Sequence, residues 1–97
     1  MYSARLTLFT RANCYLCDGA KLNIAKVQKK RTLEYAEVDV LAPGQEKWKK
    51  LYQYETPVLH VEPIPQNSVK SNSLAEPKKL WHRFSPEEIE KAINEME

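Results

Sequence analysis

Leu6-Thr7-Leu8-Phe9 is followed, after four residues, by Cys14-Tyr15-Leu16-Cys17, and these two stretches decide the fold. The first is an apolar run typical of a buried strand. The second opens a run in which apolar residues recur at helical spacing. These are the only two cysteines in the chain. Two thiols separated by two residues at a strand-to-helix turn are typical of a thiol–disulfide redox pair.

Length and composition restrict the class of protein. With 97 residues and 42% hydrophobic content, the chain is expected to form one domain over residues 1–97. A net charge of only +2 argues against nucleic-acid binding, which needs a concentrated basic face. No apolar stretch approaches the ~20 residues that cross a bilayer, and no signal-peptide core precedes the first strand. We therefore expect a monomeric cytoplasmic protein without membrane association.

Strands and helices are predicted to alternate along the first two thirds of the chain. The predicted strands are Ala4–Thr10, Leu33–Val40 and Val58–Glu62, and the predicted helices between them are Tyr15–Lys30 and Gln45–Tyr54. Trp48, Leu51 and Tyr52 are the expected buried stripe of the second helix. A helix between two strands implies that the first two strands are parallel.

The last third is expected to complete a hairpin and a helix. Residues 63–79 are polar and without periodicity, which predicts a long, mobile surface loop. A fourth strand is expected over Leu80–Phe84, antiparallel to the third. Ser85-Pro86-Glu87-Glu88 then predicts a helix start, with Ser85 as N-cap and Glu88 closing a capping box. The element order is β-α-β-α-β-β-α.

The position of the two cysteines assigns them different roles. Cys14 lies at the N-terminus of a helix, where unpaired N–H groups and the helix dipole favour an anion. Such a position lowers the pKa of a thiol from ~8.5 to roughly 3.5–7.5, which favours the attacking thiolate. Cys17 lies one helical turn further on and is expected to be less exposed. We predict that Cys14 is the nucleophile and Cys17 the resolving thiol.

From Leu6 to Met96, the order of elements resembles the thioredoxin fold. This order is strand, C-x-x-C, helix, strand, helix, Thr56-Pro57, hairpin and helix. The short form resembles the glutaredoxins, and in particular the small eukaryotic glutaredoxin-like proteins with a non-standard C-x-x-C. This resemblance implies an α/β fold with a four-stranded mixed sheet and helices on both faces. It also implies a redox-active disulfide, an oxidoreductase function in electron transport and a cis Pro57 beside the cysteines.

Further site residues are implied by the same resemblance. Thr56 and Pro57 would pair with an extended substrate or with glutathione, as an added strand would. Arg11 corresponds to a lysine that contacts a glutathione carboxylate in glutaredoxins, and Tyr15 lies between the cysteines. Asp39 is similar to an acidic residue common near that point.

The chain departs from the glutaredoxin pattern at two places. Tyr15 replaces a proline after the first cysteine, and Arg83-Phe84-Ser85-Pro86 replaces a Gly-Gly turn and an acidic residue. Because Pro86 has no N–H, we expect weaker anion binding at the start of the last helix.

The two histidines invite a zinc hypothesis together with the two cysteines. Pairing Glu62 with Leu80 would place His60 opposite His82 on one face of the hairpin. The cysteines belong to the other half of the sheet, so we expect no metal site and interpret the histidines as a cross-strand surface pair.

Two functions follow. The first is a glutaredoxin-like thiol–disulfide oxidoreductase that reduces protein disulfides or glutathione mixed disulfides. Its electrons would come from glutathione or a thioredoxin-type reductase, with glutathione as co-substrate and no tightly bound cofactor. The second is a non-catalytic thioredoxin-fold binding module, or an iron–sulfur cluster carrier that uses Cys14 as ligand.

Overall fold

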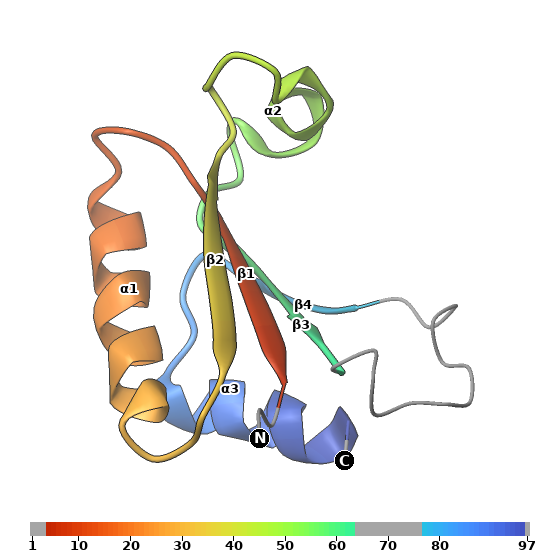
Figure 1. Ribbon diagram of the computed structural model, residues 1–97. Helices are drawn as coiled ribbons and strands as arrows, with labels where there is room; N and C mark the ends of the chain where they lie inside the picture. Colours follow the sequence, from red (N-terminus) through yellow and green to blue (C-terminus); the bar gives the residue numbers. More distant parts are fainter. Residues whose placement is uncertain (1–3, 64–76, 97) are drawn as a thin grey trace.

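The computed structural model describes residues 4–63 and 77–96. Its elements are, in order, β1 (Arg5–Thr10), α1 (Tyr15–Gln28), β2 (Glu34–Asp39), α2 (Glu46–Tyr52), β3 (Val58–Glu62), β4 (Lys78–Trp81) and α3 (Pro86–Met96) (Figure 1). This order confirms the predicted β-α-β-α-β-β-α arrangement. Most of the predicted loop over residues 63–79 lies outside the described residues. Within the described ranges, no helix combines the length and apolar character needed to cross a bilayer.

The four strands form one mixed sheet in the order β2-β1-β3-β4. β1 runs parallel to β2 and antiparallel to β3, and β3 runs antiparallel to β4. β1 is therefore a central strand, and its carboxyl end leads directly to the turn that carries Cys14. The start of β3 lies at the same end of the sheet, because Phe9 pairs with Val58.

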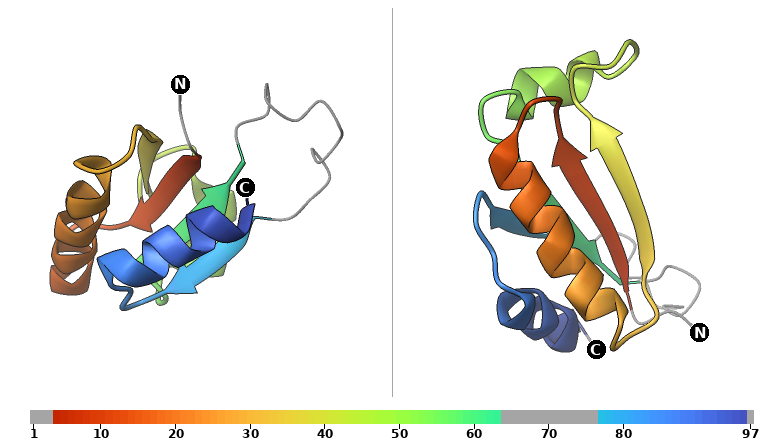
Figure 2. Two further views of the ribbon diagram at one scale, coloured as in Figure 1. Left: turned by 90° about the horizontal axis from the view of Figure 1, so that it is seen from below. Right: turned by 90° about the vertical axis from the view of Figure 1, so that its left-hand side faces the viewer.

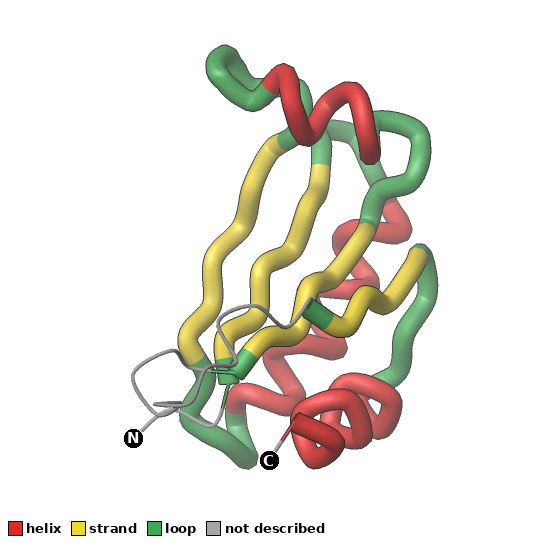
Figure 3. The backbone as a smooth tube through the Cα atoms, turned by 90° about the vertical axis from the view of Figure 1, so that its right-hand side faces the viewer, coloured by secondary structure: helices red, strands yellow, loops and turns green. Residues whose placement is uncertain are grey.

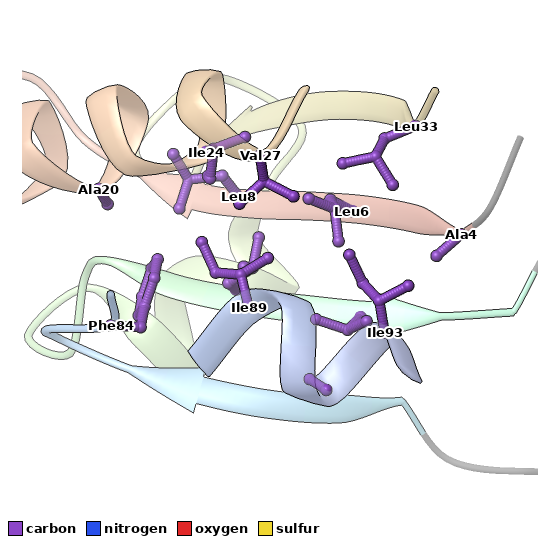
Figure 4. Close-up of a cluster of buried hydrophobic side chains, with 13 residues drawn as sticks. Ala4, Leu6, Leu8, Ala20, Ile24, Val27, Leu33, Phe84, Ile89 and Ile93 are labelled. Carbon is purple, nitrogen blue, oxygen red and sulfur yellow. The ribbon is translucent and has the colours of Figure 1, made fainter. Parts of the chain in front are cut away.

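α1 and α3 pack side by side on one face of the sheet (Figure 2). They bury the apolar side chains that alternate along β1 and β3, and Figure 4 shows these side chains between the helices and the strands. The residues of this main core are Ala4, Leu6, Leu8, Ala20, Ile24, Val27, Leu33, Leu59, Val61, Phe84, Ile89, Ala92 and Ile93. The apolar residues therefore recur at helical spacing on α1 and α3 and alternate along β1, and both patterns direct their side chains into one core.

α2 covers only one end of the opposite face (Figure 3). Trp48 and Tyr52, one turn apart, pack against Phe9 and Val58 there. The prediction that Leu51 belongs to this stripe was wrong, since its side chain is 57% exposed. A seven-residue helix presents one narrow side to the sheet, and Leu51 lies beside that side rather than on it.

β4 begins and ends earlier than the sequence suggests. Lys78 and Lys79, expected in a loop, belong to the strand, whereas residues 82–84 do not. The predicted pairing of Glu62 with Leu80 was wrong: Leu80 pairs with Leu59, and His60 pairs with Lys79. Lys78 is partly buried, and its ammonium group forms an ion pair with Glu95 on α3, a distant partner that the local sequence does not indicate.

Candidate functional site

Cys14 is the N-cap of α1 and forms a disulfide with Cys17, with 5.2 Å between their Cα atoms. The chain reaches this position through a short turn after β1. Asn13 adopts a left-handed φ of 59° in that turn, a conformation that asparagine tolerates better than most residues. Cys14 itself is extended, with φ −117° and ψ 101°, as an N-cap residue requires.

The helix N-terminus directs a donor at the sulfur of Cys14. The Cys17 N–H donates to Cys14 Sγ over 3.2 Å, so the side chain of Cys14 occupies the position of a capping acceptor. Cys14 is partly exposed, whereas Cys17 is only 1% exposed. This difference in access agrees with the expectation that Cys17 is the less exposed thiol.

The segment Thr56-Pro57 lies against the cysteines although it is 42 residues further along the chain. Thr56 Oγ1 is 3.8 Å from Cys14 Sγ. Because a disulfide sulfur carries no proton, the Thr56 hydroxyl donates in this contact. The Thr56–Pro57 bond is cis, as the resemblance implied, and both residues are buried.

His82 holds the segment Glu55–Pro57 from the other side, a role that the sequence did not reveal. Its backbone N–H donates to Pro57 O over 2.8 Å, and its Nε2 lies 2.9 Å from Glu55 Oε1. His82 has a left-handed φ of 59°, which turns the chain out of β4 immediately after Trp81. The two partners are separated from His82 by more than twenty residues, so no local pattern could have indicated these bonds.

Of the remaining predicted site residues, two lie beside Cys14 and one does not. Arg11 and Tyr15 line a shallow depression beside Cys14, together with Asn13, Asp18 and Lys21. Arg11 Nε is buried and has no hydrogen-bond partner within the described part of the chain. Tyr15 points away from the core and is 78% exposed. Asp39 lies beside Thr10 at the carboxyl end of β2 but does not line this depression, and its carboxylate accepts the Leu41 N–H.

A groove of about 490 Å³ runs along α1 beside the disulfide. Tyr15, Leu16 and Gly19 form its α1 side, and His82, Arg83 and Phe84 form the opposite side. The ring of Phe84 is buried in the main core, and Asn23 Nδ2 donates to Phe84 O over 3.0 Å. We call this space the Phe84 groove.

The two histidines do not form the predicted surface pair. His60 is buried and hydrogen-bonded to the Tyr52 hydroxyl over 2.9 Å, whereas His82 is exposed and bonded to Glu55. Burial, assisted by the charge of Lys79, lowers the pKa of His60 to about 4. Among residues 4–63 and 77–96, no three histidine, cysteine or acidic side chains are placed to hold a metal ion together.

Comparisons with known proteins agree with this geometry. Residues 5–94 match the family described as Glutaredoxin-like domain (DUF836). The chain is also similar to three solved structures. They are the protein XcR50 from X. campestris (20% identity, TM-score 0.65, covering 93% of this chain and 96% of that one), a malarial protein (14%, 0.68, 96% and 96%) and oxidised thioredoxin O2 from Arabidopsis thaliana (15%, 0.67, 96% and 74%).

The family match covers most of the chain and includes both cysteines, Thr56 and Pro57. The likeness to solved structures, at 20% identity or less, concerns the fold, and one of these structures is a thioredoxin. The disulfide at a helix N-terminus supports a redox role. The chain therefore belongs to the glutaredoxin-like family and has the thioredoxin fold.

Proposed function

We propose that this protein is a thiol–disulfide oxidoreductase in which Cys14 attacks and Cys17 resolves. The observation that carries the proposal is the disulfide between a partly exposed N-cap cysteine and a buried cysteine one turn further on. Thr56 adds a hydroxyl donor at the sulfur that would carry the negative charge.

The reaction transfers two electrons from the reduced pair to a substrate disulfide. The Cys14 thiolate attacks one sulfur of the substrate, forming a mixed disulfide and releasing the other substrate sulfur as a thiolate. Cys17 loses its proton and attacks Cys14 Sγ. This second step forms the Cys14–Cys17 disulfide and releases the remaining substrate thiol. The pair is oxidised, and the substrate disulfide is reduced to two thiols.

The order of attack follows from access and electrostatics. Cys14 lies where α1 offers its N-terminal N–H groups and the positive end of its dipole, which stabilise a thiolate. Cys17 is enclosed by the fold, so an incoming protein disulfide reaches Cys14 first. The distance between their Cα atoms, 5.2 Å, already suits the bond that the resolving step makes.

Several partners belong to this proposal. The substrates are protein disulfides or glutathione mixed disulfides, and the electrons come from glutathione or a thioredoxin-type reductase in the cytoplasm. Arg11, Tyr15, Thr56 and Pro57 contact the substrate or glutathione, and no cofactor is held permanently. The iron–sulfur carrier stays an alternative prediction, which visible absorption of the anaerobically purified protein would test.

Single-cysteine variants test the assignment of the two thiols. Reduced Cys17→Ser is expected to form a stable mixed disulfide with a peptide disulfide, because the resolving thiol is missing. Cys14→Ser is expected to form no such adduct and to lose reductase activity on a model disulfide. Mass spectrometry after proteolysis locates the adduct. Reductase activity retained by Cys14→Ser would overturn the proposed role of Cys14.

A further inference from the structure

The Phe84 groove offers apolar contact at Tyr15 and Leu16, the two residues between the redox cysteines. Leu16 and Phe84 line it, together with the exposed ring of Tyr15, the residue after Cys14. Gly19 leaves the α1 side open, because no atom lies within 4 Å of the position its Cβ would take. A ligand that fills this space gains affinity mainly through apolar side chains. Glutathione has no such side chain beyond its cysteine.

The start of α3 at the end of this groove has few free donors for a carboxylate. The Glu88 N–H donates to Ser85 Oγ, and the Ser85 N–H donates to Glu88 Oε1, so both groups are engaged within the capping box. Pro86 has no N–H. The carboxylate of Glu88 also repels a second anion placed there. The α3 end of the groove is therefore a poor site for a ligand carboxylate.

A cation is available on the opposite rim. Arg83 lines the groove, is exposed, and makes no side-chain hydrogen bond or ion pair with the other residues that the structure describes. The neighbouring His82 is engaged with Glu55. An acidic side chain of a ligand would thus be attracted by Arg83 and repelled by Glu88, which also lines the groove. The groove combines apolar side chains with one positive charge that has no partner among residues 4–63 and 77–96.

From these contacts we infer that the Phe84 groove binds an extended segment of a protein disulfide, with an apolar side chain near its cysteine and an acidic side chain that pairs with Arg83. This inference rests on the proposed function and specifies its substrate class. The chemical steps are those of the exchange at Cys14 and Cys17, with the protein disulfide as oxidant. Apolar side chains fill the groove, and the acidic residue fixes the direction of the segment.

Two synthetic peptide disulfides test the charge. Both carry leucines beside the cysteine, and they differ only in a neighbouring glutamate that is glutamine in the second peptide. The reduced protein is expected to react about fivefold faster with the glutamate peptide, the upper range for an exposed ion pair. Arg83→Gln should abolish this preference. Lys26→Gln removes an equal charge from an exposed site on α1 outside the groove, and it should keep the preference.

Gly19 allows the groove to be filled without disturbing the core. Gly19→Phe is expected to slow the reaction with both peptides about tenfold, because the new ring takes the place of one buried apolar side chain. Leu22→Phe is the matched control, because it adds the same ring at an exposed position of α1 outside the groove, and it should react as the native protein does. Reduction of the Cys14–Cys17 disulfide by dithiothreitol, which needs no groove, should be unchanged in both variants.

Binding without chemistry separates the two proposals. Serine analogues of the peptides cannot exchange, so their affinity for the protein reports the groove alone. Affinity that depends on Arg83 and Gly19, without any disulfide exchange, would support the groove and refute the oxidoreductase. Exchange that is equally fast with both peptides and in Gly19→Phe would overturn the groove and leave the oxidoreductase. Glutathione disulfide reacting as fast as the leucine peptides would also overturn the inferred substrate class.

Discussion

We predict that acidification from pH 7 to pH 5 destabilises the fold through His60. This side chain is 8% exposed, lies between α2 and the sheet, and is hydrogen-bonded to Tyr52. Its ring also contacts Phe9, with 4.6 Å between the ring centroids. A proton added here would charge a buried ring that already faces the cation Lys79. The folded state therefore keeps His60 neutral at pH values where the unfolded chain protonates it.

The sign and size of the effect follow from the two pKa values. Burial lowers the pKa of His60 from 6.5 to about 4. Between these values the unfolded state binds more protons than the folded state does. The free energy of unfolding therefore decreases as the pH falls. The folded protein has the full contribution above pH 6.5 and loses it progressively toward pH 4. The expected loss is about 2 kcal/mol between pH 7 and pH 5, with a limit of about 3 kcal/mol below pH 4.

Urea unfolding at a series of pH values measures this loss. His60→Leu should remove most of the pH dependence between pH 7 and pH 5, although leaving the Tyr52 hydroxyl unpaired costs about 1–3 kcal/mol at every pH. His82→Gln is the matched control, because it removes the only other histidine and keeps His60. An acid loss of the same size in His60→Leu as in the native protein would refute the reasoning.

Three further predictions concern the helix, the core and the site. Gly19→Ala should raise the free energy of unfolding by about 0.5–1 kcal/mol, since the added methyl group meets nothing and alanine favours the helix; a lower midpoint in urea would contradict this. Phe84→Ala should lower it by about 3–5 kcal/mol by leaving a cavity in the main core, whereas a surface position would show less than 1 kcal/mol. Thr56→Val should slow adduct formation at Cys14 about fivefold, the value of one hydrogen bond, when measured in the Cys17→Ser background. An unchanged rate would show that the hydroxyl does not assist the thiolate.

The elements that were predicted correctly are those specified by local sequence. The apolar run before Cys14, the helical spacing after it, and the Ser85 capping box all depend on residues within one or two turns of each other. The position of Thr56-Pro57 beside Cys14 is not local. It was expected only because the layout resembles a known fold, and the contact between Thr56 and Cys14 agrees with it.

The register of β4 depends on distant partners and was not predictable in the same way. Lys78 is oriented by Glu95, and the chain leaves the strand at His82, whose bonds go to Glu55 and Pro57. Phe84 turns into the main core instead of continuing the strand. The hydrophobic pattern of residues 78–84 does not indicate where β4 begins and ends, because each of these contacts involves another element. The Phe84 groove and the exposed position of Arg83 depend on the same turn and were missed for the same reason.

The central claim is that Cys14 and Cys17 form one reversible two-electron couple. Equilibrating the protein in dithiothreitol and glutathione buffers of increasing oxidised-to-reduced ratio, trapping free thiols and counting them by mass spectrometry tests it most directly. We predict a single transition in which both thiols are lost together, with a tenfold change in the oxidised-to-reduced ratio for about 30 mV. A pair that stays oxidised or reduced over the whole range, or thiols that are lost one at a time, would contradict it.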